Sequence, residues 1–228
     1  MINWFDKNQR WLRKGLKQSN NKELSEYLLK GLPDINQSVA DAHFFVLDFE
    51  TTGLDVYKDH IISAGFTEIK NNRMLLNKSE HHLVATNLKL TSENVGIHHL
   101  TDDVVAQGMQ IKALINYLLE KMAGKVLIAH YQKIEYSFIQ HACQAIYGLS
   151  LPMIILDTMM IEKNKLEKLN RRISANQLRL FNLRDDYNLP RYNAHNAMED
   201  AISTAELFLA QIQYRMSAKK NLRIKDFL

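Results

Sequence analysis

The residues best suited to chemistry are acids and a histidine at two distant places in the chain. Asp48 and Glu50 close the apolar run 44–47, and His195 precedes Asp200 far downstream. Because side chains alternate along a strand, acids two residues apart on one strand point to the same face. Hard cations such as Mg²⁺ prefer carboxylate oxygens as ligands. The pattern therefore predicts that Asp48 and Glu50 share one cluster of divalent cations.

Three segments carry a resemblance to a known family. The first is D-x-E-T-T-G at 48–53, and the third is H-x(4)-D from His195 to Asp200. Between them, 129–136 reads AHYQKIEY, which is similar to a motif built around A-H-N-x-x-F-D but has Glu135 where that motif usually has Asp. Together they resemble the DEDDh branch of the 3′→5′ exonucleases, the family of the proofreading epsilon subunit of replicative DNA polymerase, RNase T and oligoribonuclease. The resemblance runs from about residue 44 to about residue 211.

This resemblance implies a site for two Mg²⁺ or Mn²⁺ ions held by four acids, with one of them between both ions. The four acids are Asp48, Glu50, Glu135 and Asp200, and Asp48 is the one placed between the ions. Two cations about 4 Å apart activate a water and stabilise the leaving oxygen of a phosphodiester. Without metal the four carboxylates would repel one another, so at least one pKa is expected to rise.

Glu135 has two interpretations. Its side chain is longer than that of aspartate by about 1.5 Å, so it could ligate the second ion directly where Asp would act through water. Alternatively the following helix begins at a displaced position and Glu135 is only a solvated acid. Ligation is favoured because His130 and the strand 126–129 are in register with the motif.

His195 is the implied general base. Its spacing from Asp200 does not place both side chains on one helical face, and Asn196, three residues before Glu199, predicts a helix that starts just after His195. A loop histidine with an ordinary pKa near 6.5 can accept a proton from a metal-bound water at neutral pH. The alternative is an ordinary histidine of a surface loop.

The resemblance also implies residues that bind the 3′-terminal nucleotide. The segment 97–101, Ile-His-His-Leu-Thr, matches a loop whose histidine touches the terminal phosphodiester or sugar, which here is His98. A hydrogen bond at a helix end is an equally good interpretation of His98. The nucleotide pocket is expected to be lined by Phe49, Thr51 and Thr52, with Leu54 wedged against the terminal base.

Composition excludes several classes of protein. The chain has 228 residues, 46% of them hydrophobic, and a formal net charge of +4, which is compatible with a polyanionic partner without requiring one. A single cysteine, Cys143, excludes an intrachain disulfide and a cysteine-based zinc framework. The paired histidines at 81–82 and 98–99 do not have the spacing of a zinc site either. No signal peptide or membrane span is expected, so a cytoplasmic protein is predicted.

The order of patterns predicts an α/β fold with a ribonuclease H-like mixed sheet. Three antiparallel strands are expected first, with a turn at Asn71-Asn72, and helices then alternate with strands. The expected strands cover 44–49, 61–69, 73–76, 126–129 and 153–156. The expected helices cover 111–122, 138–146 and a last helix beginning near 197.

Three parts are expected along the chain: an N-terminal helical extension at 1–42, an exonuclease domain at 43–216 and a basic C-terminal tail at 217–228. The extension should hold a basic amphipathic helix bearing Trp4 and Trp11, and a second helix that ends before Gly31. Packing of both helices on the catalytic domain is favoured over an arm that docks a partner or grips DNA.

The expected function is a metal-dependent 3′→5′ exonuclease that releases nucleoside monophosphates from single-stranded DNA with a free 3′ end. Trimming of RNA or short oligonucleotides is the close alternative, and an idle nucleic-acid-binding module is the second. Association with a polymerase is not implied, because no long flexible C-terminal tether is evident. Asp157, Asp185 and Asp186 are expected to be helix-terminus or surface acids without a catalytic role.

Overall fold

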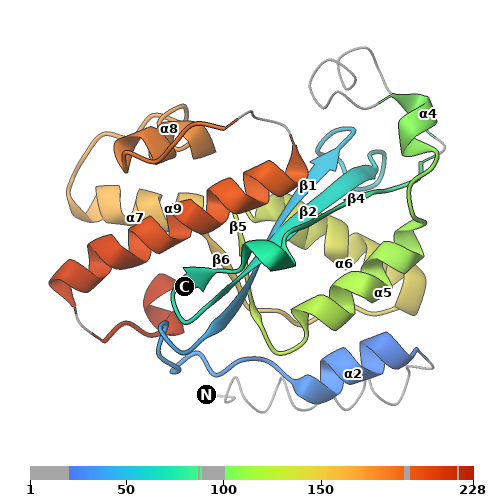
Figure 1. The fold of residues 1–228 in the computed structure, drawn as a ribbon, viewed down its shortest axis with the longest axis horizontal. Helices are drawn as coiled ribbons and strands as arrows, with labels where there is room; N and C mark the ends of the chain where they lie inside the picture. The colour runs from blue at the N-terminus through green and yellow to red at the C-terminus, as the bar shows by residue number, and fades with distance from the viewer. Residues whose placement is uncertain (1–20, 87, 89–100, 193–195, 220) are drawn as a thin grey trace.

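A mixed six-stranded sheet forms the centre of the computed structural model, which describes residues 21–86, 88, 101–192, 196–219 and 221–228 (Figure 1). The strand order is β3-β2-β1-β5-β6, and β4 also pairs with β2. β1 pairs antiparallel with β2 and parallel with β5, and β6 is parallel to β5. The predicted ribonuclease H-like mixed sheet is therefore confirmed. The bounds are β1 His43–Thr51, β2 Ile61–Lys70, β3 Arg73–Met74, β4 Glu80–Leu83, β5 Val126–Ala129 and β6 Ile155–Asp157.

The turn between β2 and β3 follows the prediction, but β3 is shorter than expected. Asn71 and Asn72 both adopt positive φ, at 53° and 55°, a conformation that asparagine tolerates better than most residues and that suits a tight hairpin. β3 ends at Met74, and a short 3₁₀ helix, Leu76–Lys78, follows it. β4 was not predicted, because its sequence Glu-His-His-Leu does not alternate between polar and apolar residues.

Helices cover both faces of the sheet, as Figure 1 shows for α9 on one face and α5 and α6 on the other. Phe45, Leu47 and Phe49 pack with the helices α2 (Lys22–Lys30), α5 (Ile111–Met122) and α6 (Lys133–Tyr147). Phe44 and Val46 pack on the opposite side with α9 (Ala197–Ala218). Because both faces of the sheet are buried at β1, residues 44–47 are all apolar rather than alternating, up to Asp48.

The N-terminal part of the described chain packs on the domain. Leu24, Tyr27 and Leu28 of α2 are buried in the same core cluster as α5, and the helix ends at Lys30, just before Gly31, which has φ 71°. This confirms the favoured interpretation for the second N-terminal helix. The first one, with Trp4 and Trp11, lies outside the described residues.

The C-terminal residues also pack on the domain. Leu222 and Phe227 are buried, and the Phe227 ring lies 5.7 Å from the ring of Phe208 in an edge-to-face arrangement. The backbone of Val39 donates a hydrogen bond to the carbonyl of Leu222 at 3.0 Å. A 3₁₀ helix, Ile224–Phe227, therefore sits against α9 within the stretch expected to be a tail.

Three further helices were not predicted: α4 (Asp102–Val105), α7 (Thr158–Lys168) and α8 (Leu180–Asp186). α7 and α8 each contact α9, and apolar residues of all three form a separate small core. In the described part of the chain, no helix combines the length and the apolar composition needed to cross a bilayer.

Candidate active site

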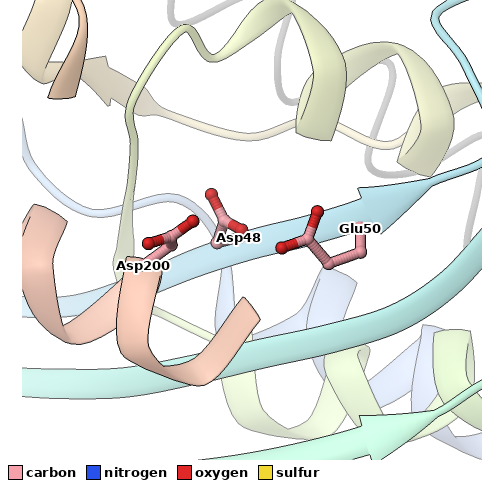
Figure 2. A group of neighbouring side chains, drawn as sticks. All are labelled: Asp48, Glu50 and Asp200. Atoms are coloured by element: carbon pink, nitrogen blue, oxygen red, sulfur yellow. The ribbon is translucent and has the colours of Figure 1, made fainter. Parts of the chain in front are cut away.

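Three carboxylates converge at the carboxyl end of β1. Asp48 and Glu50 extend from the strand and Asp200 from the first turn of α9, and one oxygen of each lies within 4.8 Å of the others (Figure 2). Figure 2 shows Asp48 and Asp200 side by side with the carboxylate of Glu50 directed toward them. The structure thus brings together three of the four acids expected to bind metal.

Gly65 explains how α9 comes so close to the sheet. It lies directly opposite Asp48 in the β1–β2 ladder, and a Cβ added there would fall 2.0 Å from the backbone of Ala197 and Met198. Since real Cβ atoms do not approach other atoms so closely, only glycine permits this contact. The start of α9 therefore rests on the strand, and Asp200 reaches the acids of β1.

The start of α9 is fixed by its cap. The side chain of Asn196 accepts hydrogen bonds from the backbone of Met198 at 3.1 Å and of Glu199 at 3.2 Å. The predicted helix start is therefore confirmed. His195, the expected general base, lies immediately before this cap but outside the described residues.

The electrostatics of the site favour a bound cation. Burial raises the pKa of Asp48 well above its ordinary value, and the negative charges of Glu135, Asp200 and Glu50 raise it further. The expectation that at least one carboxyl of the metal-free cluster has a raised pKa is met. A divalent cation among these oxygens would reverse this effect, because an opposite charge favours the ionised form.

Glu135 is buried beside the cluster rather than solvated. It is the third residue of α6, and only 2% of its surface is exposed. Burial raises its pKa to about 8, although the backbone N–H groups of Glu135 and Phe49 donate hydrogen bonds that lower it. Its Oε2 is buried without a hydrogen-bond partner among the residues that the structure describes. The interpretation as a solvated helix acid is wrong; ligation of metal stays a prediction, since the group within 4.8 Å holds only the other three acids.

The turn between β5 and α6, which positions Glu135, is held by two side chains. Asp157 accepts hydrogen bonds from the backbone of Tyr131 at 3.0 Å and of Gln132 at 3.1 Å, and it also caps α7. Tyr131 has φ 64°, a left-handed conformation that bulky residues rarely adopt. Asp157, expected at a helix terminus, therefore stabilises the start of two helices.

His130 is the second of these side chains. Its Nε2 lies 3.0 Å from the carbonyl oxygen of Leu178 and its Nδ1 2.8 Å from the hydroxyl of Thr158. Because a carbonyl can only accept, Nε2 carries the proton and Nδ1 accepts from the hydroxyl. Burial lowers the pKa of His130 to about 4, so the ring is neutral near pH 7. His130 thus connects the motif to the segment before α8.

The residues expected to bind the terminal nucleotide lie in different environments, from the buried core to an exposed loop. Phe49 is 5% exposed in the core, on the face opposite Asp48 and Glu50, so its ring is not brought to the acids. Thr51 donates a hydrogen bond to the carbonyl of Gly53, and Thr52 donates one to Asp59. Leu54 is 73% exposed on the same loop, and His98 lies outside the described residues.

Sequence reasoning missed the role of Gly65 and one of the two roles of Asp157. A glycine inside an apolar strand is itself a signal of close backbone approach, so Gly65 could have been found. Asp157 was expected at a helix terminus, but its hydrogen bonds to the turn before α6 join residues far apart in the sequence, so no local pattern indicated them.

The fold and the acid cluster define a nuclease of the ribonuclease H-like class with a cluster of carboxylates that could hold a metal ion. The family described as "Exonuclease", of the RNase T type, matches residues 45–208. The chain therefore belongs to this family, in its DEDDh branch.

Two relatives and two solved structures illustrate the likeness. The chain is 25% identical over 188 residues to a PolC-type DNA polymerase III of Thermotoga maritima and 26% identical over 170 residues to the 3′-5′ exonuclease DinG of Staphylococcus haemolyticus. These matches cover 82% and 75% of this chain but only 13% and 18% of the relatives.

The solved structures share the fold. The nuclease domain of 3′hExo, a DEDDh family member bound to rAMP, superposes with a TM-score of 0.64 at 13% identity, covering 78% of this chain and 95% of that one. Escherichia coli exonuclease I, solved with a dT13 oligonucleotide, superposes with a TM-score of 0.62 at 13% identity, covering 78% and 42%.

Proposed function

We propose that this chain is a metal-dependent 3′→5′ exonuclease that releases nucleoside monophosphates from the 3′ ends of single-stranded DNA. The observation that carries the proposal is the convergence of Asp48, Glu50 and Asp200 within 4.8 Å on a DEDDh exonuclease fold. The membership of this chain in the family and its likeness to the 3′-5′ exonuclease DinG support the direction of cleavage.

The residues present fit a pair of Mg²⁺ or Mn²⁺ ions. Asp48, Glu50 and Asp200 would hold one ion, and Asp48 together with Glu135 would hold the second. The buried Oε2 of Glu135, which has no hydrogen-bond partner in the described part of the chain, and the raised pKa of Asp48 both support this assignment. When bound, the ions would lower the pKa of water and neutralise charge on the leaving oxygen.

His195 would act as the general base. In the sequence it directly precedes Asn196, the cap of the helix whose first turn carries Asp200. Its imidazole would take the proton of the attacking water, because the ordinary pKa of histidine lies near neutral pH.

Single-stranded DNA is favoured as the substrate, with RNA as the second candidate. Exonuclease I was solved with a dT13 oligonucleotide, and the relatives are a DNA polymerase and DinG. RNA stays a candidate because 3′hExo was solved with rAMP. The idle-module interpretation is disfavoured because Glu135 is buried at the cluster rather than displaced from it.

A 5′-labelled single strand tests the proposal. Incubation with Mg²⁺ or Mn²⁺ is expected to shorten the strand stepwise from its 3′ end and release mononucleotides, whereas a chelator is expected to stop the reaction. Asp48→Ala and His195→Ala should abolish it, while Asp41→Ala, an exposed acid far from the cluster, should not. Matched DNA and RNA strands compared by kcat/KM decide the sugar preference. Activity that survives both Asp48→Ala and chelation would contradict the proposal.

A further inference from the structure

An arginine that is not part of the acid cluster is buried between α8 and α9. Arg184 of α8 is 0% exposed, and its Nε has no hydrogen-bond partner among the residues that the structure describes. Burying a guanidinium is costly, and an apolar side chain of similar size is often as stabilising at such a place. Packing alone therefore does not account for a charge at this position.

The guanidinium of Arg184 joins two parts of the chain. Its Nη1 donates a hydrogen bond to the carbonyl of Ser203 at 2.6 Å, and its Nη2 donates one to the carbonyl of Pro190 at 2.6 Å. The same Nη2 lies 2.7 Å from Oε2 of Glu206, so the two side chains form an ion pair. Ser203 and Glu206 belong to α9, whereas Pro190 belongs to the segment that leads to this helix. Arg184 therefore ties that segment to α9.

The same segment is held at a second residue. Tyr192 donates a hydrogen bond to Oε1 of Glu206 at 3.0 Å, and the centre of its ring lies 4.9 Å from the guanidinium of Arg184. Both oxygens of Glu206 are thus used, one for each partner. The side chain of Glu206 is only 23% exposed, so water screens this ion pair less than one at the surface. The Arg184–Glu206 pair therefore holds the segment at both Pro190 and Tyr192.

The proposed general base follows this held segment closely in the sequence. Only residues 193–195 separate Tyr192 from Asn196, whose side chain caps α9. Four peptide units span at most about 14 Å. Both ends of this short connection are fixed to α9, one by Glu206 and the other by the cap. The Arg184–Glu206 pair thus fixes the upstream end of the connection that contains His195.

We propose that the Arg184–Glu206 pair positions His195, and that it acts on the rate through this histidine rather than through the acids. This inference rests on the proposed exonuclease function, in which His195 is the general base. A general base contributes about 10²–10⁴-fold only where it reaches the proton that it accepts. A misplacement of about 1 Å can cost about a hundredfold in rate. Directional hydrogen bonds give the segment this precision, whereas an apolar side chain would fill the space without fixing it.

The double variant Arg184→Met, Glu206→Met removes the pair without leaving one charge buried alone. Since replacement of a buried ion pair by apolar residues is often neutral for stability, its melting temperature should stay within about 4 °C of the parent. Its kcat with Mg²⁺ is expected to fall by about tenfold or more, while KM for a DNA strand changes by less than about twofold. Tyr192→Phe, which removes only the hydroxyl, should lower kcat by about twofold to fivefold.

A cycle with His195→Ala tests the route of this effect. If the pair acts through His195, adding His195→Ala to the double variant should give the same kcat as His195→Ala alone, because both changes remove one contribution. Losses that multiply would place the effect elsewhere and overturn the proposal. A weaker Mn²⁺ affinity of the double variant, measured by calorimetry, would place it at the acids and overturn it as well. An unchanged kcat in the double variant would also overturn it.

Arg215→Met is the matched control. Nη1 of Arg215 donates a hydrogen bond to the carbonyl of Asp226 at 2.6 Å, and its guanidinium lies 4.5 Å from the centre of the Phe227 ring. It therefore also ties a segment to α9, but near the end of the helix opposite Asp200. This variant should unfold at a lower temperature and keep the kcat of the parent. An equal loss of kcat in Arg215→Met and the double variant would overturn the proposal.

Hydrogen exchange in a chelator tests the pair without requiring turnover. In the double variant the amides of residues 187–192 are expected to exchange about tenfold faster than in the parent, while those of α9 keep their rates. Equal exchange of residues 187–192 in the two proteins would show that the pair does not hold this segment, and would overturn the proposal. Absence of turnover with Mg²⁺ in the parent would instead count against the proposed function, since exchange is measured separately.

Discussion

The two ends of the β1–β2 pair both bury carboxylates, yet they treat the charge in opposite ways. Near the start of β1, burial alone would raise the pKa of Glu68, but Lys125, which donates a hydrogen bond at 2.7 Å, and His43 bring it below its ordinary value. At the carboxyl end, Asp48 has acids as its titratable neighbours, and its pKa rises. At the Glu68 end, side chains of the protein supply the compensating positive charge. At the Asp48 end, the carboxylates are left to be compensated by cations from solution.

The largest effect is expected at Asp48. Asp48→Asn should lower kcat by about a thousandfold or more, because a ligand of the metal site is lost. In a chelator the same variant should unfold at a higher temperature than the parent, since like-charge repulsion is relieved. Turnover kinetics with Mg²⁺ measures the loss of kcat, and thermal unfolding in a chelator measures the change in stability.

Glu68→Gln is the matched control for that variant. It removes a carboxylate whose cations belong to the protein, so it should destabilise by about 1–3 kcal/mol and leave metal binding unchanged. If Asp48→Asn and Glu68→Gln shift the unfolding temperature in the same direction, the two ends of the β1–β2 pair do not differ in how their carboxylate charge is compensated.

Gly65→Ala should separate Asp200 from the acids of β1. The added methyl group meets the α9 backbone, so α9 must shift, and a displacement of about 1 Å can lower the rate by about a hundredfold. Overpacking should also cost about 1–3 kcal/mol of stability. Mn²⁺ affinity, measured by calorimetry, is expected to weaken with the activity.

Gly148→Ala distinguishes the loss of stability from the loss of Mn²⁺ affinity. Gly148 has φ 69° at the end of α6, with open space around it, so alanine there adds only backbone strain. That variant should lose stability and keep its Mn²⁺ affinity. Equal Mn²⁺ affinity in the two glycine variants would show that the contact at Gly65 does not position Asp200.

The pH dependence of stability should have opposite signs at the two ends. Glu135 has a folded-state pKa raised from 4.5 to about 8, so the metal-free folded state holds its proton more tightly. The stability it contributes is fully present below pH 4.5 and is lost as the pH rises through about 8. Glu68, with a lowered pKa, contributes stability above pH 4.5 that is lost as the pH falls.

Urea unfolding in a chelator between pH 6 and pH 8 measures the Glu135 contribution. Glu135→Gln should flatten the decline of unfolding free energy over this range, because no proton is released at that position. Mg²⁺ affinity of the parent should increase over the same range as the carboxyl ionises. An unchanged slope in Glu135→Gln would mean that Glu135 is ionised in the metal-free protein.

The smallest effect is expected at the cap of α9. Asn196→Ala removes the acceptor for two backbone N–H groups and should cost about 1 kcal/mol. It should also reduce kcat a few-fold, because the same turn carries Asp200. Asn21→Ala removes the equivalent cap of α2, far from the acids, and should cost similar stability without reducing kcat.

Local patterns predicted much of this molecule, and tertiary contacts explain the rest. Strand alternation predicted that Asp48 and Glu50 lie on one face, and a capping pattern predicted the helix start at Asn196. Both patterns depend only on neighbouring residues. α7 and β4 lack a periodic apolar pattern, so their positions follow from packing against α9 and β2. The burial of Glu135 could not be predicted, because α6 begins at Lys133, five residues before the apolar stripe that indicated the helix.

The backbone at Tyr131 has a consequence for engineering this enzyme. A left-handed residue with a bulky side chain is strained by about 1–3 kcal/mol, and asparagine, the usual residue at this place in the motif, tolerates the conformation better. Tyr131→Asn should therefore raise the melting temperature. Because this turn leads into the helix that carries Glu135, a less strained turn should also keep that carboxyl in place to a higher temperature.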